Sequence, residues 1–199
     1  MSAVNAAALV RDRRAWAWLF LVAALATAVM IFCFSAQQAE DSQALSDGVT
    51  LEVAKVVRPD FPRLPAAERA SLLTTLGRIV RKCAHFLEFA LLGFNLTCWL
   101  RLRSASVRPL WAAVPGWGIA TLYAATDELH QAFVAGRGPG IVDVGIDSGG
   151  ALTGALVATL VLWIAFGILA KMEKSGRYEY RNAASPVRPT RHSRFTFRQ

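Results

Sequence analysis

Hydrophobic residues fall into four long runs along the chain, at about 15–34, 83–100, 109–126 and 148–170. The first run holds no charged residue over twenty positions, and twenty helical residues cover about 30 Å, the thickness of a bilayer core. Only His85, Glu88 and Asn95 interrupt the second run. The third run is rich in glycine and in tryptophan, which anchors helices at membrane interfaces. The pattern predicts an all-α integral membrane protein with four transmembrane helices.

Two weaker helical patterns lie between the first and second runs. Residues 47–57 and 66–80 both carry apolar side chains at near-helical spacing. Pro59, Pro62 and Pro65 separate them, and Pro65 suits the start of a helix. We predict two short amphipathic helices in the first external loop, which either lie on the membrane surface or pack against the spans.

The fourth run begins with a row of small residues. Gly150, Gly154 and Ala158 recur every four positions and so share one face of a helix. Small side chains let a neighbouring helix approach closely, so this face is predicted to serve helix packing.

Composition and charge support a membrane protein and set its orientation. Hydrophobic residues make up 54% of the chain and charged residues 18%, whereas soluble domains carry about 25% charged residues. Lysine and arginine are concentrated in 1–14, 101–108 and 171–199. By the positive-inside rule these three segments face the cytoplasm. The formal net charge of +8 is therefore interpreted as a topology signal and not as a nucleic-acid-binding surface.

The domain organisation follows from these runs. Residues 1–14 are predicted to be a cytoplasmic N-terminus, 15–170 the membrane domain, and 171–199 a basic, disordered cytoplasmic tail. The first apolar run is longer than that of a signal peptide and lacks a clear cleavage site, so we expect it to be retained.

Ionisable residues near the membrane boundary gather on the non-cytoplasmic side. Lys82, His85 and Glu88 are spaced by three, which places neighbours on one side of a helix. A charged side chain inside a span costs at least ~2.5 kcal/mol, so it is retained where it faces protein or a water-filled cavity. The second run therefore points a polar stripe toward an external cavity.

A second stripe closes the third run. Asp127 is followed at three and four residues by His130 and Gln131, whereas Glu128 lies about 100° away and is predicted to point elsewhere. Asp143 and Asp147 are four apart, although Gly145 leaves a regular helix there open. Together these segments predict one polar pocket outside the membrane.

Three sequence blocks resemble the VanZ-like family. They read FSAQ, RKCAHFLEFALLGF and DELHQAFVAGRGPGIVDVGIDSGGALTGAL, and in the family's order they cover residues 35–156. The resemblance implies a small multi-pass protein of the bacterial cytoplasmic (inner) membrane, related to an accessory factor for teicoplanin resistance. The polar positions that match the family are Ser35, Lys82, His85, Glu88, Asp127, Glu128, His130, Gln131, Arg137, Asp143 and Asp147.

One functional hypothesis is an enzyme that acts on an envelope lipid or peptidoglycan precursor by phosphoryl or acyl transfer. His85 or His130 would act as acid, base or nucleophile, oriented by a carboxylate. The catalytic candidates are His85, His130, Glu88, Asp127 and Glu128. The substrate-binding candidates are Ser35, Lys82, Gln131, Arg137, Asp143 and Asp147.

Three other interpretations stay open. In the first, the protein is an accessory binder that modulates glycopeptide or precursor interactions. In the second it is a transporter or proton relay, and in the third a scaffold of buried ion pairs. In the last case Lys82 would pair with Glu88, or Arg137 with Asp143.

The same side chains include enough donors for zinc, manganese or magnesium. There is no HExxH motif and no recognised ligand spacing, so the sequence leaves the presence of a divalent metal open. The partners expected are the lipid bilayer and an envelope lipid or precursor, and the oligomeric state is not predicted.

Overall fold

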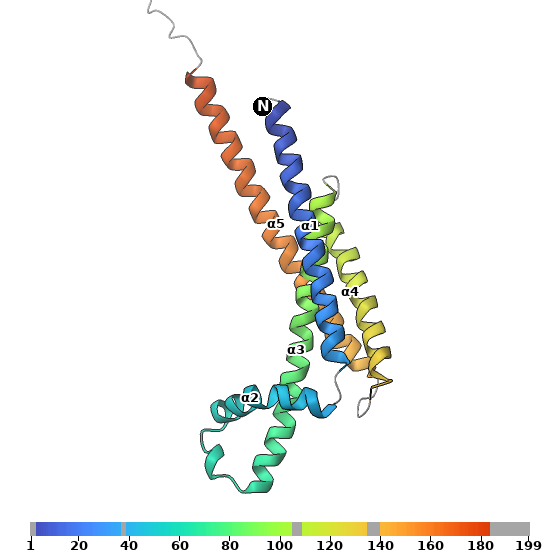
Figure 1. Cartoon of the computed structure of the whole chain (residues 1–199). Helices are drawn as coiled ribbons and strands as arrows, with labels where there is room; N and C mark the ends of the chain where they lie inside the picture. The colour runs from blue at the N-terminus through green and yellow to red at the C-terminus, as the bar shows by residue number, and fades with distance from the viewer. Residues whose placement is uncertain (1–2, 37–38, 105–108, 135–139, 184–199) are drawn as a thin grey trace, which may run out of the picture. The chain divides into compact units, whose positions relative to one another are not determined.

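Helices account for the regular structure of the part of the chain that this computed structural model describes. It describes the backbone of residues 3–36, 39–104, 109–134 and 140–183, and the side chains of 13–36, 47–104, 111, 113–134 and 140–172. The elements are α1 (Ala3–Ser35), α2 (Ala39–Val57), the 3₁₀ turn η1 (Phe61–Arg63), α3 (Ala66–Arg103), α4 (Pro109–Gln131) and α5 (Ile141–Ala183) (Figure 1). The predicted all-α class is confirmed.

The chain divides into two units, residues 1–162 and 163–199. The first unit contains α1 to α4 and the beginning of α5, and it holds all the site residues described below. The described part of the second unit is the continuing helix α5, which runs to Ala183. The predicted tail therefore begins as helical backbone, and residues 184–199 lie outside the described residues.

Three helices are long and apolar enough to cross a membrane among the described residues. They are Arg13–Ser35, Ala66–Arg103 and Ile141–Met172. Large apolar side chains point outward along them, and Val22 and Val29 of α1 are each 62% exposed. Exposed apolar surface on this scale is typical of contact with lipid. Helix α4 is not among the three, because glycine, tryptophan and threonine dilute its apolar residues and Asp127 and Glu128 lie near its end.

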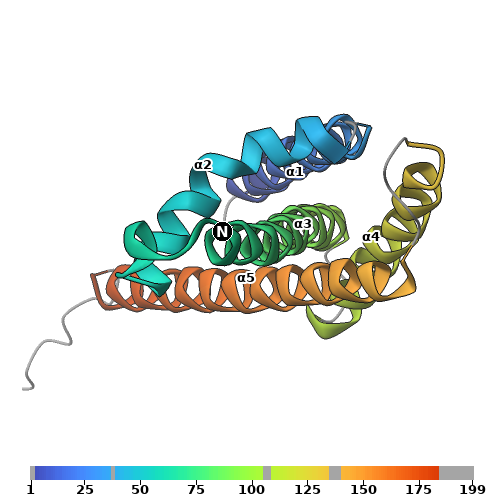
Figure 2. The same cartoon turned by 90° about the horizontal axis from the view of Figure 1, so that it is seen from below.

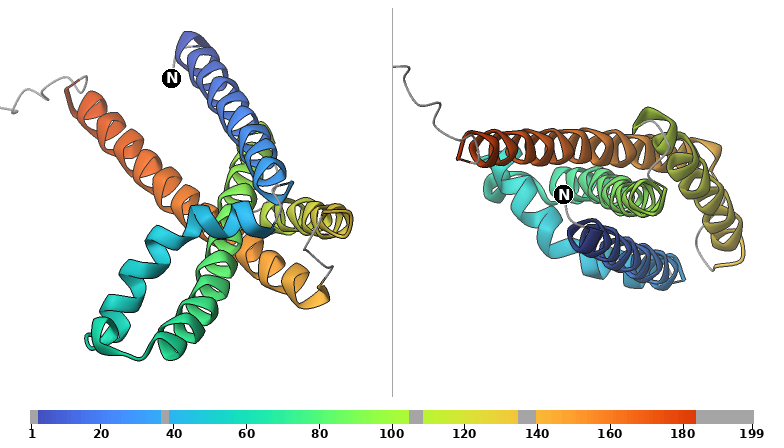
Figure 3. Two further views of the ribbon diagram at one scale, coloured as in Figure 1. Left: turned by 60° about the horizontal axis from the view of Figure 1, so that its bottom comes forward. Right: turned by 90° about the horizontal axis from the view of Figure 1, so that it is seen from above.

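Helix α3 is the central element of the first unit. It lies between α1 and the N-terminal part of α5, as seen in Figure 2 and in the right view of Figure 3. Its 38 residues extend over about 57 Å, nearly twice the thickness of a bilayer core. One end of α3 must therefore project beyond the membrane.

The prediction of a separate short helix at 66–80 is wrong, because this segment is the first half of α3. Pro65 precedes the helix as expected, and no proline follows until Pro109. The backbone therefore has no reason to break before the apolar run. The other predicted short helix is present and longer than expected, as α2.

Helix α2 packs against this first half of α3. Ala54 of α2, Phe61 of η1 and Leu76 of α3 form a small buried cluster. Gly77 of α3 lies opposite Thr50, so that α2 comes close to α3 there. The helix pair therefore has a small core of its own.

A second core joins α1, α3, α4 and the start of α5. Its buried residues are mostly alanine and leucine around one large side chain, Phe89, which is fully buried. The Tyr123 hydroxyl of α4 donates a 2.7 Å hydrogen bond to the Ala28 carbonyl of α1. This core fixes the helix ends that carry the polar residues.

The small-residue face of α5 packs directly on α3, as predicted. A Cβ on Gly150 would collide with the Phe86 carbonyl oxygen, and one on Gly154 with the Ala90 carbonyl oxygen. Backbone-to-backbone contact of this kind is possible only without side chains. It sets the separation of α3 and α5 in the turns that follow the polar residues of both helices.

We expect Gly154→Ala to destabilise the protein by about 1–3 kcal/mol, since the added methyl group forces α5 away from α3. The measurement is reversible unfolding in mixed detergent micelles. Gly145→Ala in the same helix is the control: nothing lies within 4 Å of its Cβ position, and alanine favours the helix. Equal stability of the two variants would contradict the close packing.

Candidate functional site

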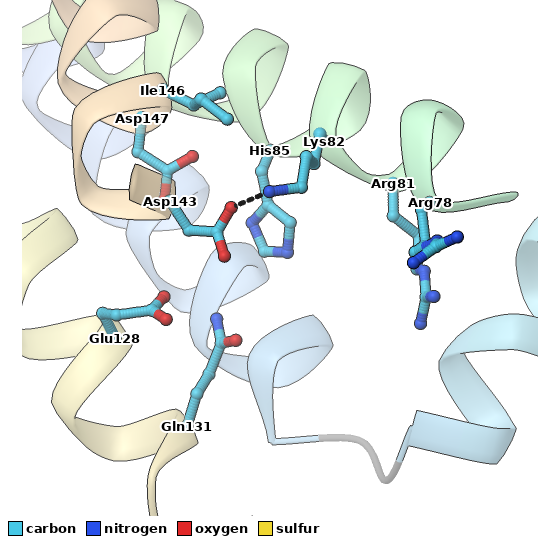
Figure 4. A pocket seen from close by; sticks show the side chains of 9 residues that line it. All are labelled: Arg78, Arg81, Lys82, His85, Glu128, Gln131, Asp143, Ile146 and Asp147. Atoms are coloured by element: carbon cyan, nitrogen blue, oxygen red, sulfur yellow. Dashed lines mark hydrogen bonds and ion pairs between the residues drawn. The ribbon is translucent and has the colours of Figure 1, made fainter. Parts of the chain in front are cut away.

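A polar cavity of about 170 Å³ opens where α3, α4 and α5 meet. It is lined by Arg78, Arg81, Lys82, His85, Glu128, Gln131, Asp143, Ile146 and Asp147 (Figure 4). Figure 4 shows the two arginines on one side and the carboxylates of α5 and α4 on the other. Lys82 and His85 lie between the two sides. The cavity is therefore electrically polarised.

Lys82 of α3 forms an ion pair with Asp143 of α5 across the cavity wall. The alternative pairing of Lys82 with Glu88 is wrong, since Asp143 is brought to Lys82 by the packing of the two helices. The side chains of the pair are 47% and 40% exposed. Exposed ion pairs contribute about 0–1 kcal/mol, so this one arranges the cavity more than it stabilises the fold.

Two arginines form the cationic side of the cavity. Arg78 and Arg81 belong to the first half of α3 and reach the cavity from there. Among the described side chains neither guanidinium forms an ion pair. Arginine presents a planar fork of donors that matches phosphate or carboxylate oxygens in a bidentate arrangement. This side of the cavity is suited to an anionic group.

His85 and Glu88 form a pair one helical turn apart on α3. The His85 Nδ1 lies 3.6 Å from Glu88 Oε2, a contact that becomes an ion pair when the imidazole is protonated. Both side chains are largely buried, at 24% and 15% exposure. His85 lines the cavity, and Glu88 lies behind it on the next turn. The separation is too long for a hydrogen bond, but a carboxylate at this distance favours the charged form of the ring.

The predicted divergence of Asp127 and Glu128 is present. Glu128 points toward the start of α5, where its Oε1 accepts a hydrogen bond from the Gly140 backbone N–H. A carboxylate in this position also interacts favourably with the positive end of the helix dipole. Glu128 is buried and lines the cavity. It thereby ties α4 to α5 at the anionic side.

Asp147 is the most deeply buried carboxylate of the cavity, with 3% exposure. Helix α5 is regular through Gly145, so Asp143 and Asp147 lie on one face as a helix requires. Within the described part of the chain no cation lies at ion-pair distance from Asp147. The anionic side thus contains a buried charge whose partner is not among these side chains.

Ser35 and Asp127 hold α1 against α4 instead of facing the cavity. The Ser35 hydroxyl donates a 2.7 Å hydrogen bond to Asp127 Oδ2, and Gln131 Nε2 donates a 3.0 Å bond to the same oxygen. Ser35 is fully buried and Asp127 nearly so. Gln131 joins this network to the cavity, which it also lines.

His130 lies away from the cavity. Its ring stacks on Phe32 of α1 with 4.8 Å between centroids, and it is not among the lining residues. The structure therefore places His85 and His130 in different environments. Arg137 lies outside the described residues, so its predicted role and its pairing with Asp143 stay predictions.

Sequence reasoning missed Arg78 and Ile146, and it treated Arg81 only as part of a motif. A signal for Arg78 was present: it precedes Lys82 by four residues and His85 by seven, on one face of a helix. A separate helix at 66–80 would end the stripe at Lys82, whereas the continuous α3 extends it to Arg78.

No group of three or more histidine, cysteine, aspartate or glutamate side chains in the described ranges has the geometry to hold a metal ion. The three cysteines are free, and Cys33 and Cys83 are exposed while Cys98 is buried.

The apolar helices and the polar cavity at their ends define the class of protein: an all-helical membrane protein. Comparison with known families then identifies it further. A model of the VanZ/LLP1 family matches residues 20–164, and the chain belongs to this family. The match covers every described residue of the cavity. Comparisons with curated proteins and with solved structures found no match.

Ser35→Ala is expected to lower stability by about 1–3 kcal/mol, because a buried carboxylate loses a hydrogen-bond donor. Unfolding in mixed detergent micelles measures the loss. Ser71→Ala, at an exposed position of α3, is the matched control and should change stability by less than about 0.5 kcal/mol. If both variants behave alike, the network does not hold α1 to α4.

Proposed function

We propose that the protein binds the phosphate group of an envelope lipid or lipid-linked peptidoglycan precursor and that His85 acts on it. The observation that carries this proposal is the placement of Arg78 and Arg81 beside His85 in one cavity at the ends of membrane helices. Two guanidinium groups provide up to four directed hydrogen bonds for phosphate oxygens. The cavity thereby combines a binding group with a proton-transfer group.

His85 has the surroundings of a general acid–base catalyst. It takes a proton from an attacking water or hydroxyl and returns it to the leaving group, while Glu88 stabilises the imidazolium in between. Phosphoryl and acyl transfer both need this proton movement. Of the other catalytic candidates, only Glu128 lines the same cavity.

The proposed setting is a four-span protein with both termini in the cytoplasm. Helix α4 supplies the fourth span: its 23 residues extend over about 35 Å, enough to cross a bilayer core. In the first unit, α1 and α4 run opposite to α3 and to the start of α5 (Figure 1). With the basic segments inside, the cavity opens on the non-cytoplasmic face of the inner membrane.

A second candidate function is a non-catalytic accessory role, in which the cavity holds an envelope precursor and alters its access to glycopeptides such as teicoplanin. One observation favours it. Asp127 and Ser35 are used in packing α1 against α4, and His130 stacks on Phe32, which leaves few candidates for chemistry. Binding without turnover needs only the arginines and the carboxylates.

The catalytic proposal predicts that His85→Ala reproduces the lipid and precursor profile of cells lacking the protein, at normal protein abundance. His130→Ala is the matched control and should keep the wild-type profile, since His130 does not line the cavity. Mass spectrometry of extracted membranes provides the measurement. Identical profiles in wild-type, deletion and His85→Ala cells would contradict the catalytic proposal and favour the accessory role.

The topology predicts that Cys83 reacts with a membrane-impermeant maleimide in intact cells, because it is exposed beside the cavity residues of α3. A Cys33→Ser, Cys98→Ser background isolates it. Ser104→Cys in a Cys83→Ser version of that background, at the opposite end of α3, should react only after the cells are opened. The reverse pattern would place the cavity in the cytoplasm.

A further inference from the structure

We infer that the cavity selects a zwitterionic headgroup that carries a phosphate and a primary ammonium group, as phosphoethanolamine lipids do. This inference rests on the proposed function and names the substrate class for the same site. It follows from the arrangement of charge in the cavity.

The charges of the cavity do not cancel locally. Lys82 and Asp143 neutralise each other at the wall between the two sides. This leaves the two arginines on one side and the buried Asp147 carboxylate on the other. A simple anion would be attracted by the arginines and repelled by this carboxylate. A ligand with both signs of charge satisfies the two sides at once.

Asp147 gives the clearest requirement for a cation. It is 97% buried, it lines the cavity, and the described side chains place no cation at ion-pair distance. Burying a carboxylate without a partner is unfavourable by several kcal/mol. A ligand ammonium at this position supplies the missing charge and donates hydrogen bonds to the carboxylate.

The lining residues distinguish a primary ammonium from choline. Quaternary ammonium groups are recognised by the faces of aromatic rings. The described lining contains no phenylalanine, tyrosine or tryptophan, and Ile146 is its only apolar residue. Carboxylate oxygens instead need N–H donors, which choline lacks. The chemistry therefore favours ethanolamine over choline.

The size of the cavity agrees with a small polar headgroup. Its volume of about 170 Å³ has room for a phosphate with a two-carbon amine. The glycerol and acyl chains would stay outside, beside the apolar helices.

The test measures binding to the purified full chain in detergent micelles by titration calorimetry. The probes are dihexanoyl lipids with ethanolamine, glycerol or choline attached to the phosphate, and free O-phosphoethanolamine. We expect the ethanolamine lipid to bind about tenfold more tightly than the other two lipids, a difference of about 1.4 kcal/mol. It should also bind more tightly than free O-phosphoethanolamine. Equal affinity of these two would assign the site to a soluble compound instead of a lipid.

Two variants with matched controls locate the selectivity. Asp147→Asn should remove the preference for ethanolamine and leave the binding of the glycerol lipid unchanged or tighter, whereas Asp47→Asn at an exposed position of α2 should change nothing. Arg78→Gln should weaken the binding of all three lipids, and Arg69→Gln, at an exposed position of α3, should leave their affinities unchanged. The wild-type comparison alone decides the question if a variant does not fold.

The outcomes separate the two proposals. If the glycerol lipid binds as tightly as the ethanolamine lipid, or if Asp147→Asn keeps the preference, the zwitterion inference is wrong while phosphate binding stands. If no lipid binds to the folded wild-type protein, phosphate recognition fails as well.

Discussion

The contact between the backbones of α3 and α5 determines where every group of the cavity lies. Gly150 and Gly154 allow α5 to touch the Phe86 and Ala90 carbonyls. Phe86 directly follows His85 on one helix, and Gly150 lies one helical turn after Asp147 on the other. A larger residue at either glycine would separate the cationic and anionic sides of the cavity. The geometry of the cavity thus depends on the packing of α5 on α3.

Helix α4 completes the arrangement by using two faces for two purposes. Asp127 faces α1 and is held by Ser35 and Gln131, whereas the neighbouring Glu128 faces α5 and the cavity. The 100° rotation between successive residues of a helix separates these functions. A buried hydrogen-bonded carboxylate on one face therefore positions a cavity-lining carboxylate on the other.

Much of this fold could be predicted from the sequence, since long apolar runs and small-residue spacing are local signals. Helix α5 and its packing face, the start of α3 at Pro65 and the divergence of Asp127 from Glu128 follow from such signals. The continuity of α3 could not be predicted, because its amphipathic first half and its apolar second half have different periodic patterns. The hydrophobic pattern predicts four spans, and the described residues include three helices that meet the length and hydropathy requirements.

The candidate site was predicted less completely, for a physical reason. Spacing tells which residues share a helix face, but not which neighbour that face meets. His130 shares a face with Asp127, and packing places its ring on Phe32 of α1 and not in the cavity. Lys82 likewise finds its partner 61 residues away on α5, a choice that depends on the contact of two helices.

The uninterrupted length of α3 has a mechanical consequence. From Arg78 to His85 the helix rises by about 10 Å, and this spacing is fixed because no proline breaks the rod between them. The depth of the cavity is therefore set by how far α3 is immersed in the lipid. A thicker bilayer would draw the histidine inward and bring the arginines to the level of the surface, since hydrophobic mismatch shifts or tilts a rigid helix. Under the proposed function, membrane thickness would determine which part of a lipid the cavity can reach.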